Sequence, residues 1–196
     1  MVVSTNAQSI QTKKKKMSKN IETAIVANGC FWCTEAIFQL LKGVKSVTSG
    51  YTGGTIKNPS YNQITTGRTG HAEAIKIVFD ANVISYQELL EVFFSTHDPT
   101  TLNRQGYDKG TQYRSAIFYN SEAQKETANS LIEALTQAEV FKKPIVTEVT
   151  NLDVFYKAED YHQNYYINNK TQGYCVAVIN PKLEKFIKNY KDKLKK

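Results

Sequence analysis

Residues 23–41 read TAIVANGCFWCTEAIFQLL, a segment that predicts a strand, a turn and a helix in succession. Its first six residues form a short β-rich run that a glycine ends. Apolar residues then recur with helical spacing up to the last leucine. Cys30 is therefore expected where a strand gives way to a helix N-terminus, and Cys33 within the first turn of that helix.

The rest of the chain alternates strand-like and helix-like segments, without internal repeats or a linker to a second domain. Some strands follow one another with no helix between them, so we expect one α+β domain with a mixed sheet rather than a doubly wound parallel fold. Ser85 and Glu88 have the spacing of a capping box and predict the start of a helix. Further strands are expected at about 46–52, 74–79, 115–119, 145–150 and 174–179, and further helices at about 121–138, at 159–169 and from Pro181 onward.

Two long segments lack any sustained period. Residues 54–71 are rich in Gly, Asn, Pro, Ser and Thr, and residues 97–112 are similarly irregular. Loops of this length are uncommon inside a compact domain unless they carry function. We therefore expect both segments to contribute side chains to a functional site.

The net charge of +7 is concentrated at the two ends of the chain. Residues 1–19 and residues 182–196 each carry +5, so the 162 residues between them carry −3. A nucleic-acid-binding protein more often has its basic side chains on the folded surface, so we expect no nucleic-acid partner. The polar, basic residues 1–20 are expected to form a disordered leader, ahead of a domain at 21–196 that ends in a lysine-rich helix.

Composition favours a cytoplasmic protein. No apolar run approaches the roughly 18 residues that span a bilayer, so no membrane association is expected. The N-terminal residues lack the apolar core, of about 7–15 residues, that a secretory signal has. The chain has 3 cysteines, an odd number that argues against a framework of structural disulfides. In a reducing cytoplasm, thiols more often serve catalysis or metal binding.

Cys30 has the position of a reactive thiol. A helix N-terminus stabilises a thiolate through its exposed amide N–H groups and its dipole, so we expect the pKa of this thiol to lie below the usual value of about 8.5. Cys33 completes a Cys-x-x-Cys pair, a spacing that permits a redox disulfide and occurs in thioredoxin-like proteins. The length of the chain and its two long loops argue against that class. For Cys175, far along the chain, residue type alone leaves a core role and a functional role equally open.

A metal site is not expected. Structural zinc sites need four ligands, usually supplied as two closely spaced pairs. This chain has one close cysteine pair, and its histidines, His71, His97 and His162, are scattered singly. We expect each histidine to be a hydrogen-bonded structural residue.

Several motifs, in order, resemble the type A methionine sulfoxide reductases. The segment GCFWCTE at 29–35 is similar to the nucleophile motif of that family. The resemblance covers roughly residues 22–180 and occupies both long loops. The further matching blocks are YTGG (51–54), NPSY (58–61), TGHAEA (69–74), HDPT (97–100), RQG (104–106) and DKGTQYRS (108–115).

The resemblance implies a two-layer α/β sandwich with a mixed sheet and a ferredoxin-like core, and it makes 21–196 a catalytic reductase domain. The implied reaction is the reduction of the S epimer of methionine sulfoxide, free or in proteins. Cys30 would attack the sulfoxide sulfur and Glu73 would protonate the oxygen, which requires a carboxyl that burial keeps neutral. The implied substrate-binding residues are Tyr61 and Tyr113 on the oxygen, Phe31 and Trp32 around the methyl group, and Asp108 on the polar side of the pocket.

The reaction leaves Cys30 as a sulfenic acid, which a second thiol converts to a disulfide. Many family members have glycine at the position of Cys33, whereas Cys175 resembles the family's distal resolving thiol. We favour Cys175 over Cys33, because a disulfide within one helical turn is often strained. The resemblance further implies thioredoxin as the external reductant, replaceable by dithiothreitol in vitro, together with no bound cofactor, no metal and a monomeric protein.

Two alternatives remain open on the sequence alone. A general dithiol–disulfide oxidoreductase would use Cys30 and Cys33 to reduce protein disulfides and would ignore methionine sulfoxide. A noncatalytic binding module would hold a methionine side chain in an aromatic pocket, and its Cys30→Ser variant would bind equally well.

Overall fold

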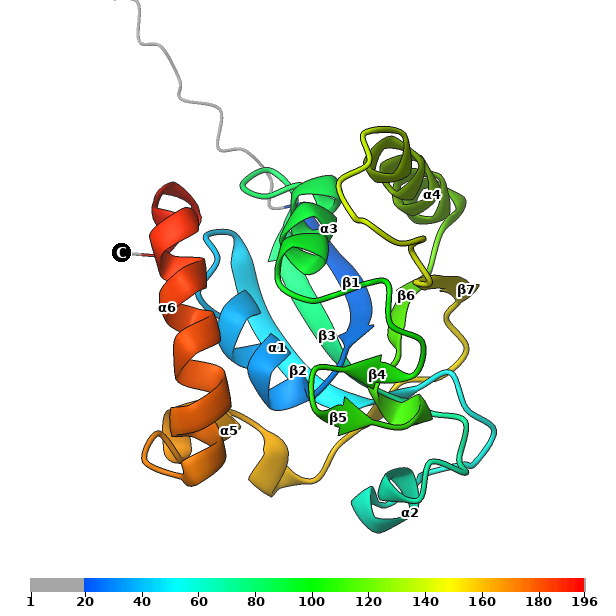
Figure 1. The fold of residues 1–196 in the computed structure, drawn as a ribbon, viewed down its shortest axis with the longest axis vertical. Helices are drawn as coiled ribbons and strands as arrows, with labels where there is room; N and C mark the ends of the chain where they lie inside the picture. The colour runs from blue at the N-terminus through cyan, green and yellow to red at the C-terminus, as the bar shows by residue number, and fades with distance from the viewer. Residues whose placement is uncertain (1–19, 196) are drawn as a thin grey trace, which may run out of the picture.

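β1 (Ile21–Asn28), dark blue in Figure 1, is the strand that the sequence predicts at the start of the domain. Its residues 24–27 are buried. A strand that is covered on both faces needs a continuous apolar run, which the sequence AIVA supplies. This computed structural model describes residues 20–195, so the expected leader at 1–20 lies outside the described residues apart from Asn20.

Five further strands of the described residues complete one sheet with β1: β2 (Val44–Thr52), β3 (Ala72–Asp80), β6 (Ser115–Tyr119), β7 (Glu148–Asn151) and β8 (Tyr156–Lys157). The strand order is β7-β6-β1-β3-β2-β8. β1 pairs antiparallel with β3 and β6, and β2 pairs antiparallel with β3 and β8, whereas β6 and β7 are parallel. The prediction of an α+β fold with a mixed sheet is confirmed.

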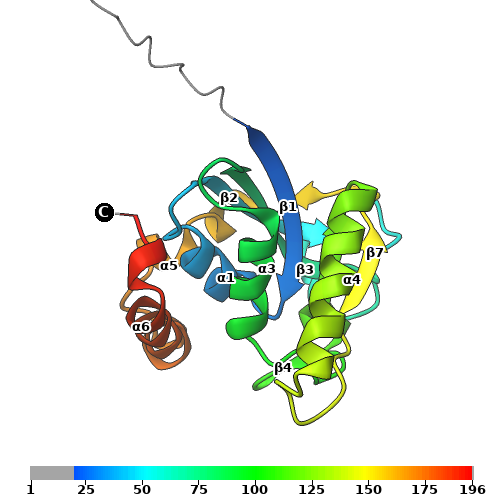
Figure 2. The ribbon, with the colours of Figure 1, turned by 90° about the horizontal axis from the view of Figure 1, so that it is seen from above.

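The longer helices of the described residues are α1 (Phe31–Phe38), α3 (Tyr86–Ser95), α4 (Glu122–Gln137) and α6 (Asn180–Asn189). The predicted capping box is present at α3, where the Glu88 N–H donates to Ser85 Oγ at 3.1 Å and the Ser85 N–H donates to Glu88 Oε2 at 2.9 Å. Ser121 caps α4 and accepts from the Gln124 N–H at 3.3 Å. α4 and α6 lie at opposite sides of the molecule in both Figure 1 and Figure 2.

The two faces of the sheet bury alternate residues of each strand. On one face, Ala24 and Val26 of β1 join the main hydrophobic core with residues of all four longer helices. On the other face, Ile25 and Ala27 join a smaller core that Phe155 packs against. The helices therefore cover one face of the sheet, while an irregular segment near β8 covers part of the other.

The predicted strand at 174–179 is wrong, because these residues are helical. A π-helical turn, Cys175–Ile179, leads directly into α6. The valine- and isoleucine-rich sequence favours a strand. Cys175 and Ile179, four residues apart, are nevertheless both fully buried, whereas Val176 is 52% exposed. That spacing matches one face of a helix, so packing against the core outweighs the local preference.

The long loops contain short elements that the sequence did not predict, since elements of two to five residues show no period. They are α2 (Tyr61–Thr65), the hairpin of β4 (Arg104–Gln105) with β5 (Asp108–Lys109), and a 3₁₀ turn (Thr111–Tyr113). The predicted helix at 159–169 is divided between a 3₁₀ turn (Asp160–His162) and α5 (Tyr165–Asn168). Within residues 20–195, no helix is long and apolar enough to cross a membrane.

Candidate active site

A cavity of about 150 Å³ lies at the N-terminus of α1. The sequence assigned seven of its eight lining residues to the site, although they come from segments far apart in the chain. The turn after β1 brings Cys30 to the cavity, the first turn of α1 brings Phe31 and Trp32, and β3 brings Glu73. Tyr61 and Asp108 come from the two long loops, and Tyr113 comes from the 3₁₀ turn that ends the second loop. The lining residues are Cys30, Phe31, Trp32, Tyr61, Glu73, Asp108, Tyr113 and Tyr174.

Cys30 is the N-cap residue of α1, as predicted, but its side chain makes no cap hydrogen bond. The expected low pKa is wrong. Burial raises the pKa of the Cys30 thiol well above its ordinary value, and the Cys33 thiol and the Glu73 carboxyl raise it further. Removing a thiolate from water disfavours its charged form, and this desolvation is the largest cause of the shift. Cys30 is therefore a neutral thiol in the free protein.

Cys33, in the first turn of α1, is the thiol whose pKa is lowered. A hydrogen bond from Cys30 is the largest cause and lowers the pKa of Cys33 to about 7. The Lys182 ammonium and the Tyr174 hydroxyl lower this pKa further, whereas burial raises it. Cys33 Sγ lies 3.9 Å from Tyr174 Oη. The first negative charge of this thiol pair therefore forms on Cys33, one turn behind the thiol that faces the cavity.

Glu73 is 2% exposed and lies between two neighbouring strands of the sheet. Burial raises the pKa of its carboxyl to about 8, against the hydrogen bond that the Phe31 N–H donates to Glu73 Oε2 at 3.1 Å. Most Glu73 side chains therefore carry a proton at neutral pH. The burial that a carboxylic proton donor needs is present at this residue.

The two predicted tyrosines enter the cavity from the loops as neutral phenols. Burial raises the pKa of Tyr61 to about 12 and raises the pKa of Tyr113 above its ordinary value, and the charge of Glu73, when ionised, adds to both effects. Neither hydroxyl has a hydrogen-bond partner among residues 20–195. Both are thus available to donate to an oxygen atom in the cavity.

Tyr174 is a lining residue that the sequence did not identify. Its hydroxyl donates to Asp108 Oδ2 at 3.2 Å, and its ring packs edge-on against Trp32 with the centroids 5.7 Å apart. The only sequence signal was its place beside Cys175, in a segment that resembled a strand. Because that segment is helical, Tyr174 faces the cavity while Cys175 faces the core.

Cys175, the favoured resolving thiol, does not line the cavity. Its side chain is fully buried at the start of the π-helical turn. Burial raises the pKa of Cys175, and the charge of Cys33 raises it further, so these two thiols are close enough to influence each other. Cys33 and Cys175 both belong to the main hydrophobic core, so Cys30 is the one cysteine of the three that lines the cavity.

The three histidines make hydrogen bonds at separate places. His71 Nδ1 accepts from the Gly54 N–H at 3.0 Å, and His97 Nδ1 and Nε2 lie 2.7 Å from Phe93 O and Ser115 Oγ. Among the residues that the structure describes, no group of three His, Cys, Asp or Glu side chains is arranged to hold a metal ion.

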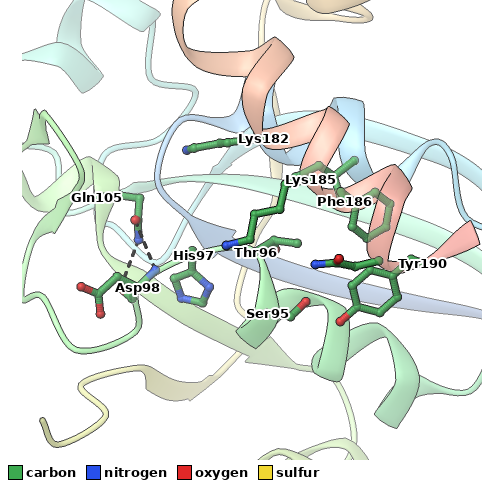
Figure 3. Close-up of a pocket in the computed structure, with 11 residues that line it drawn as sticks. Ser95, Thr96, His97, Asp98, Gln105, Lys182, Lys185, Phe186 and Tyr190 are labelled. Atoms are coloured by element: carbon green, nitrogen blue, oxygen red, sulfur yellow. Dashed lines mark hydrogen bonds between the residues drawn. The ribbon is translucent and has the colours of Figure 1, made fainter. Parts of the chain in front are cut away.

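A larger cavity of about 610 Å³ lies between the C-terminal end of α3, the loop after it and α6 (Figure 3). Gln105 lines this cavity and is the cross-strand partner of Asp108, which lines the smaller one, so the β4–β5 hairpin contributes to the lining of both. Lys182 also lines it and is the residue whose charge lowers the pKa of Cys33. No thiol lines the larger cavity, so the reactive groups converge on the smaller one.

Comparison with curated proteins finds close relatives over nearly the whole chain. The chain is 54% identical over 195 residues to the peptide methionine sulfoxide reductase MsrA of Deinococcus radiodurans, covering 100% of this chain and 92% of that protein. It is 53% identical to the protein of the same name from Sulfolobus acidocaldarius, covering 88% of this chain and 97% of that protein.

Solved structures agree with the fold. Reduced Mxr1 from Saccharomyces cerevisiae superimposes with a TM-score of 0.75 at 32% identity, covering 82% of this chain and 94% of that chain. Methionine sulfoxide reductase A of Corynebacterium diphtheriae gives 0.70 at 34% identity, covering 78% of this chain and 76% of that chain. The family model described as peptide methionine sulfoxide reductase matches residues 22–195. With this match and relatives of such identity, the chain belongs to the peptide methionine sulfoxide reductase family.

Proposed function

We propose that residues 21–196 form a catalytic domain that reduces the S epimer of methionine sulfoxide, free or in proteins, to methionine. One observation carries the proposal: a thiol, a neutral buried carboxyl, two unpartnered phenols and two aromatic rings line a single cavity of about 150 Å³. The size suits one methionine side chain. Membership of the family, whose relatives are named for this activity, supports the same conclusion.

In the proposed reaction, the Cys30 sulfur attacks the sulfoxide sulfur while the Glu73 carboxyl donates its proton to the oxygen. A sulfoxide oxygen is a poor leaving group until it is protonated, so a positioned acid lowers the barrier. The oxygen moves from the substrate to Cys30, which becomes a sulfenic acid, and methionine is released. The proton of the Cys30 thiol passes to Glu73, which restores the carboxyl and balances the step.

The remaining lining residues orient the substrate in this proposal. Tyr61 and Tyr113 donate hydrogen bonds to the sulfoxide oxygen, where negative charge develops, without becoming ionised themselves. Phe31 and Trp32, with ring centroids 6.4 Å apart, enclose the methyl group. Asp108 organises the polar side through the hydroxyl of Tyr174.

Cys175 is the proposed resolving thiol. Its thiol attacks the Cys30 sulfenic acid, a disulfide forms and water leaves. Because Tyr174 lines the cavity, Cys175 lies one residue behind its wall. We propose that the turn Cys175–Ile179 opens to bring this thiol to Cys30; single π-helical turns are rare and often lie at functional sites.

Cys33 is the alternative resolving thiol. It shares a hydrogen bond with Cys30 and has a pKa of about 7, so much of it is a nucleophilic thiolate at neutral pH. Either route yields one disulfide per methionine formed, which a dithiol reductant must cleave. We propose thioredoxin for that role, or dithiothreitol in vitro; a relative, Mxr1 of Saccharomyces cerevisiae, is known in complex with Trx2.

We propose a ferredoxin-like core in a two-layer sandwich. Two observations support it: along the chain, the core elements follow in the order β1, α1, β2, β3, α3, β6, and in the sheet the strands lie in the order β6, β1, β3, β2. We further propose a cytoplasmic monomer that needs no bound cofactor and no membrane.

A second candidate function, general dithiol–disulfide exchange, is favoured by the lowered pKa of Cys33 within its Cys-x-x-Cys pair. One assay separates the two. With dithiothreitol as reductant, we expect the enzyme to convert the S epimer of a blocked methionine sulfoxide and to leave the R epimer unchanged, and we expect the Cys30→Ser variant to convert neither. Reduction of a protein disulfide without any conversion of the S epimer would contradict the proposed function.

A further inference from the structure

We propose that His162 is a positioning residue that fixes the Trp32 indole in the wall of the substrate cavity. The inference rests on the proposed function for its catalytic consequence. The Trp32 Nε1–H donates to His162 Nδ1 at 3.0 Å. His162 is fully buried and does not itself line the cavity, so it acts through the residues that do.

The hydrogen bond fixes the protonation state of the imidazole. An indole N–H only donates, so His162 Nδ1 must accept and the ring proton must lie on Nε2. Burial lowers the pKa of His162, which favours this neutral form. A protonated ring has no acceptor, so the neutral imidazole is the state that can hold Trp32.

Glu159 faces the opposite side of the imidazole. His162 Nε2 is buried without a hydrogen-bond partner among the described residues and lies 3.9 Å from Glu159 Oε2. The same carboxylate accepts from the Tyr51 hydroxyl at 2.9 Å and from the Tyr61 N–H at 2.8 Å. One short segment therefore holds both the ring that bonds Trp32 and the start of the helix that carries Tyr61.

The contacts of Trp32 show why one hydrogen bond has a specific effect. The indole stacks on Tyr165 with ring centroids 3.6 Å apart and an interplanar angle of 6°. Stacking fixes the plane of a ring but permits it to slide and turn within that plane. The bond to His162 removes this freedom, and the His162 ring also packs against Phe31 at 5.0 Å and Tyr61 at 4.4 Å. Three lining residues thus share one buried support.

The test uses the only tryptophan in the chain, so fluorescence excited at a wavelength that the 12 tyrosines do not absorb reports on Trp32 alone. His162→Phe keeps an aromatic ring and removes the acceptor, whereas His162→Asn places a carbonyl oxygen near the position of Nδ1. We expect His162→Phe to shift the emission maximum and to increase quenching by acrylamide in the substrate-free enzyme. We expect His162→Asn to resemble the parent protein. Tyr161→Phe, an exposed neighbour whose ring also packs on His162, is the control for altered packing alone.

The kinetic expectation is a change in KM rather than in kcat. Loss of one hydrogen bond corresponds to roughly a five- to tenfold effect, so His162→Phe should raise KM for the blocked S-sulfoxide by about that factor. Its kcat should change by less than about twofold, because the reacting groups remain in place. In a Trp32→Phe background, which lacks the donor, His162→Phe should have no further effect on KM.

Two outcomes would overturn the proposal. One is an emission maximum and a quenching by acrylamide that stay unchanged in His162→Phe. The other is a rise in KM on His162→Phe that is equally large in the parent protein and in the Trp32→Phe background. If His162→Phe does not fold, His162→Gln replaces it. The glutamine amide lies one bond further from the backbone than the asparagine amide, so we expect the glutamine to miss the indole N–H that the asparagine can reach. The fluorescence comparison needs no substrate. It therefore tests the positioning role even if the S epimer is not reduced, an outcome that would refute the proposed function alone.

Discussion

Burial gives the Glu73 carboxyl the neutral state that its proposed role as proton donor requires. A carboxyl with a pKa near 8 is mostly protonated at neutral pH, and the desolvation that raises the pKa comes from the strands on both sides of Glu73. The same burial keeps Tyr61 and Tyr113 as phenols. Three neutral donors thus face the position where a sulfoxide oxygen would sit.

The proposed role of Glu73 as proton donor predicts a pH profile with a definite direction. The acid form is present below the pKa and is lost as pH rises through it, so kcat/KM should fall above a pH of about 8. Glu73→Gln removes the proton donor and should slow the reduction by roughly 10²–10⁴-fold. The remaining activity should lack the fall near pH 8. The rate of a single turnover, measured from pH 6 to 10 for both proteins, checks this. A variant with near-parental activity would rule out the role.

At the scale of elements, the strand-to-helix junction was predictable and the helix after Gly173 was not. Residues 23–41 carry their own signals: an apolar run, a glycine and then a helical spacing. Residues 174–179 are helical because one face is buried by the core, and the sequence of the segment does not contain that information. For the same reason the sequence did not identify Tyr174 as a lining residue, and it predicted a hydrogen bond for His162 without its partner Trp32, since both contacts span more than 60 residues of chain.

The helical setting of Cys175 sharpens the test of the resolving step. Cys175→Ser should stop multiple turnover with thioredoxin, while one equivalent of methionine still forms per enzyme, because Cys30 and the acid are intact. Cys33→Ser, the matched variant, should retain multiple turnover with thioredoxin. Quantifying methionine per enzyme, with each reductant, checks both. The reverse pattern, with turnover lost only in Cys33→Ser, would assign the resolving step to the thiol of the first helical turn.

At the scale of the whole molecule, the site is assembled where separate segments meet at one end of α1. The motif blocks predicted which loop residues meet there, because they carry the resemblance to the family. The opposite end of α1 is tied down by the end of the described chain. The Lys42 N–H donates to Lys193 O, and the Lys195 N–H donates to Leu40 O, both at 2.8 Å. The sequence predicts only a charged helix for this lysine-rich segment. In the structure its last residues are also hydrogen-bonded to the chain that follows α1.

This attachment predicts that removal of residues 191–196 lowers stability without altering the site. The deletion breaks the two backbone hydrogen bonds, the ion pair of Lys193 Nζ with Glu88 Oε1 at 3.0 Å, and the packing of Leu194 against the main core. Backbone bonds and partial burial of a leucine together suggest a loss of about 2–4 kcal/mol in the free energy of unfolding, with the exposed ion pair adding little. Urea unfolding measures the loss, with Lys191→Ala in the full chain as the control. At urea concentrations too low to unfold the protein, KM should stay unchanged, because the deleted contacts lie at the end of α1 remote from Cys30. A deletion variant with a raised KM and an unchanged free energy of unfolding would contradict this prediction.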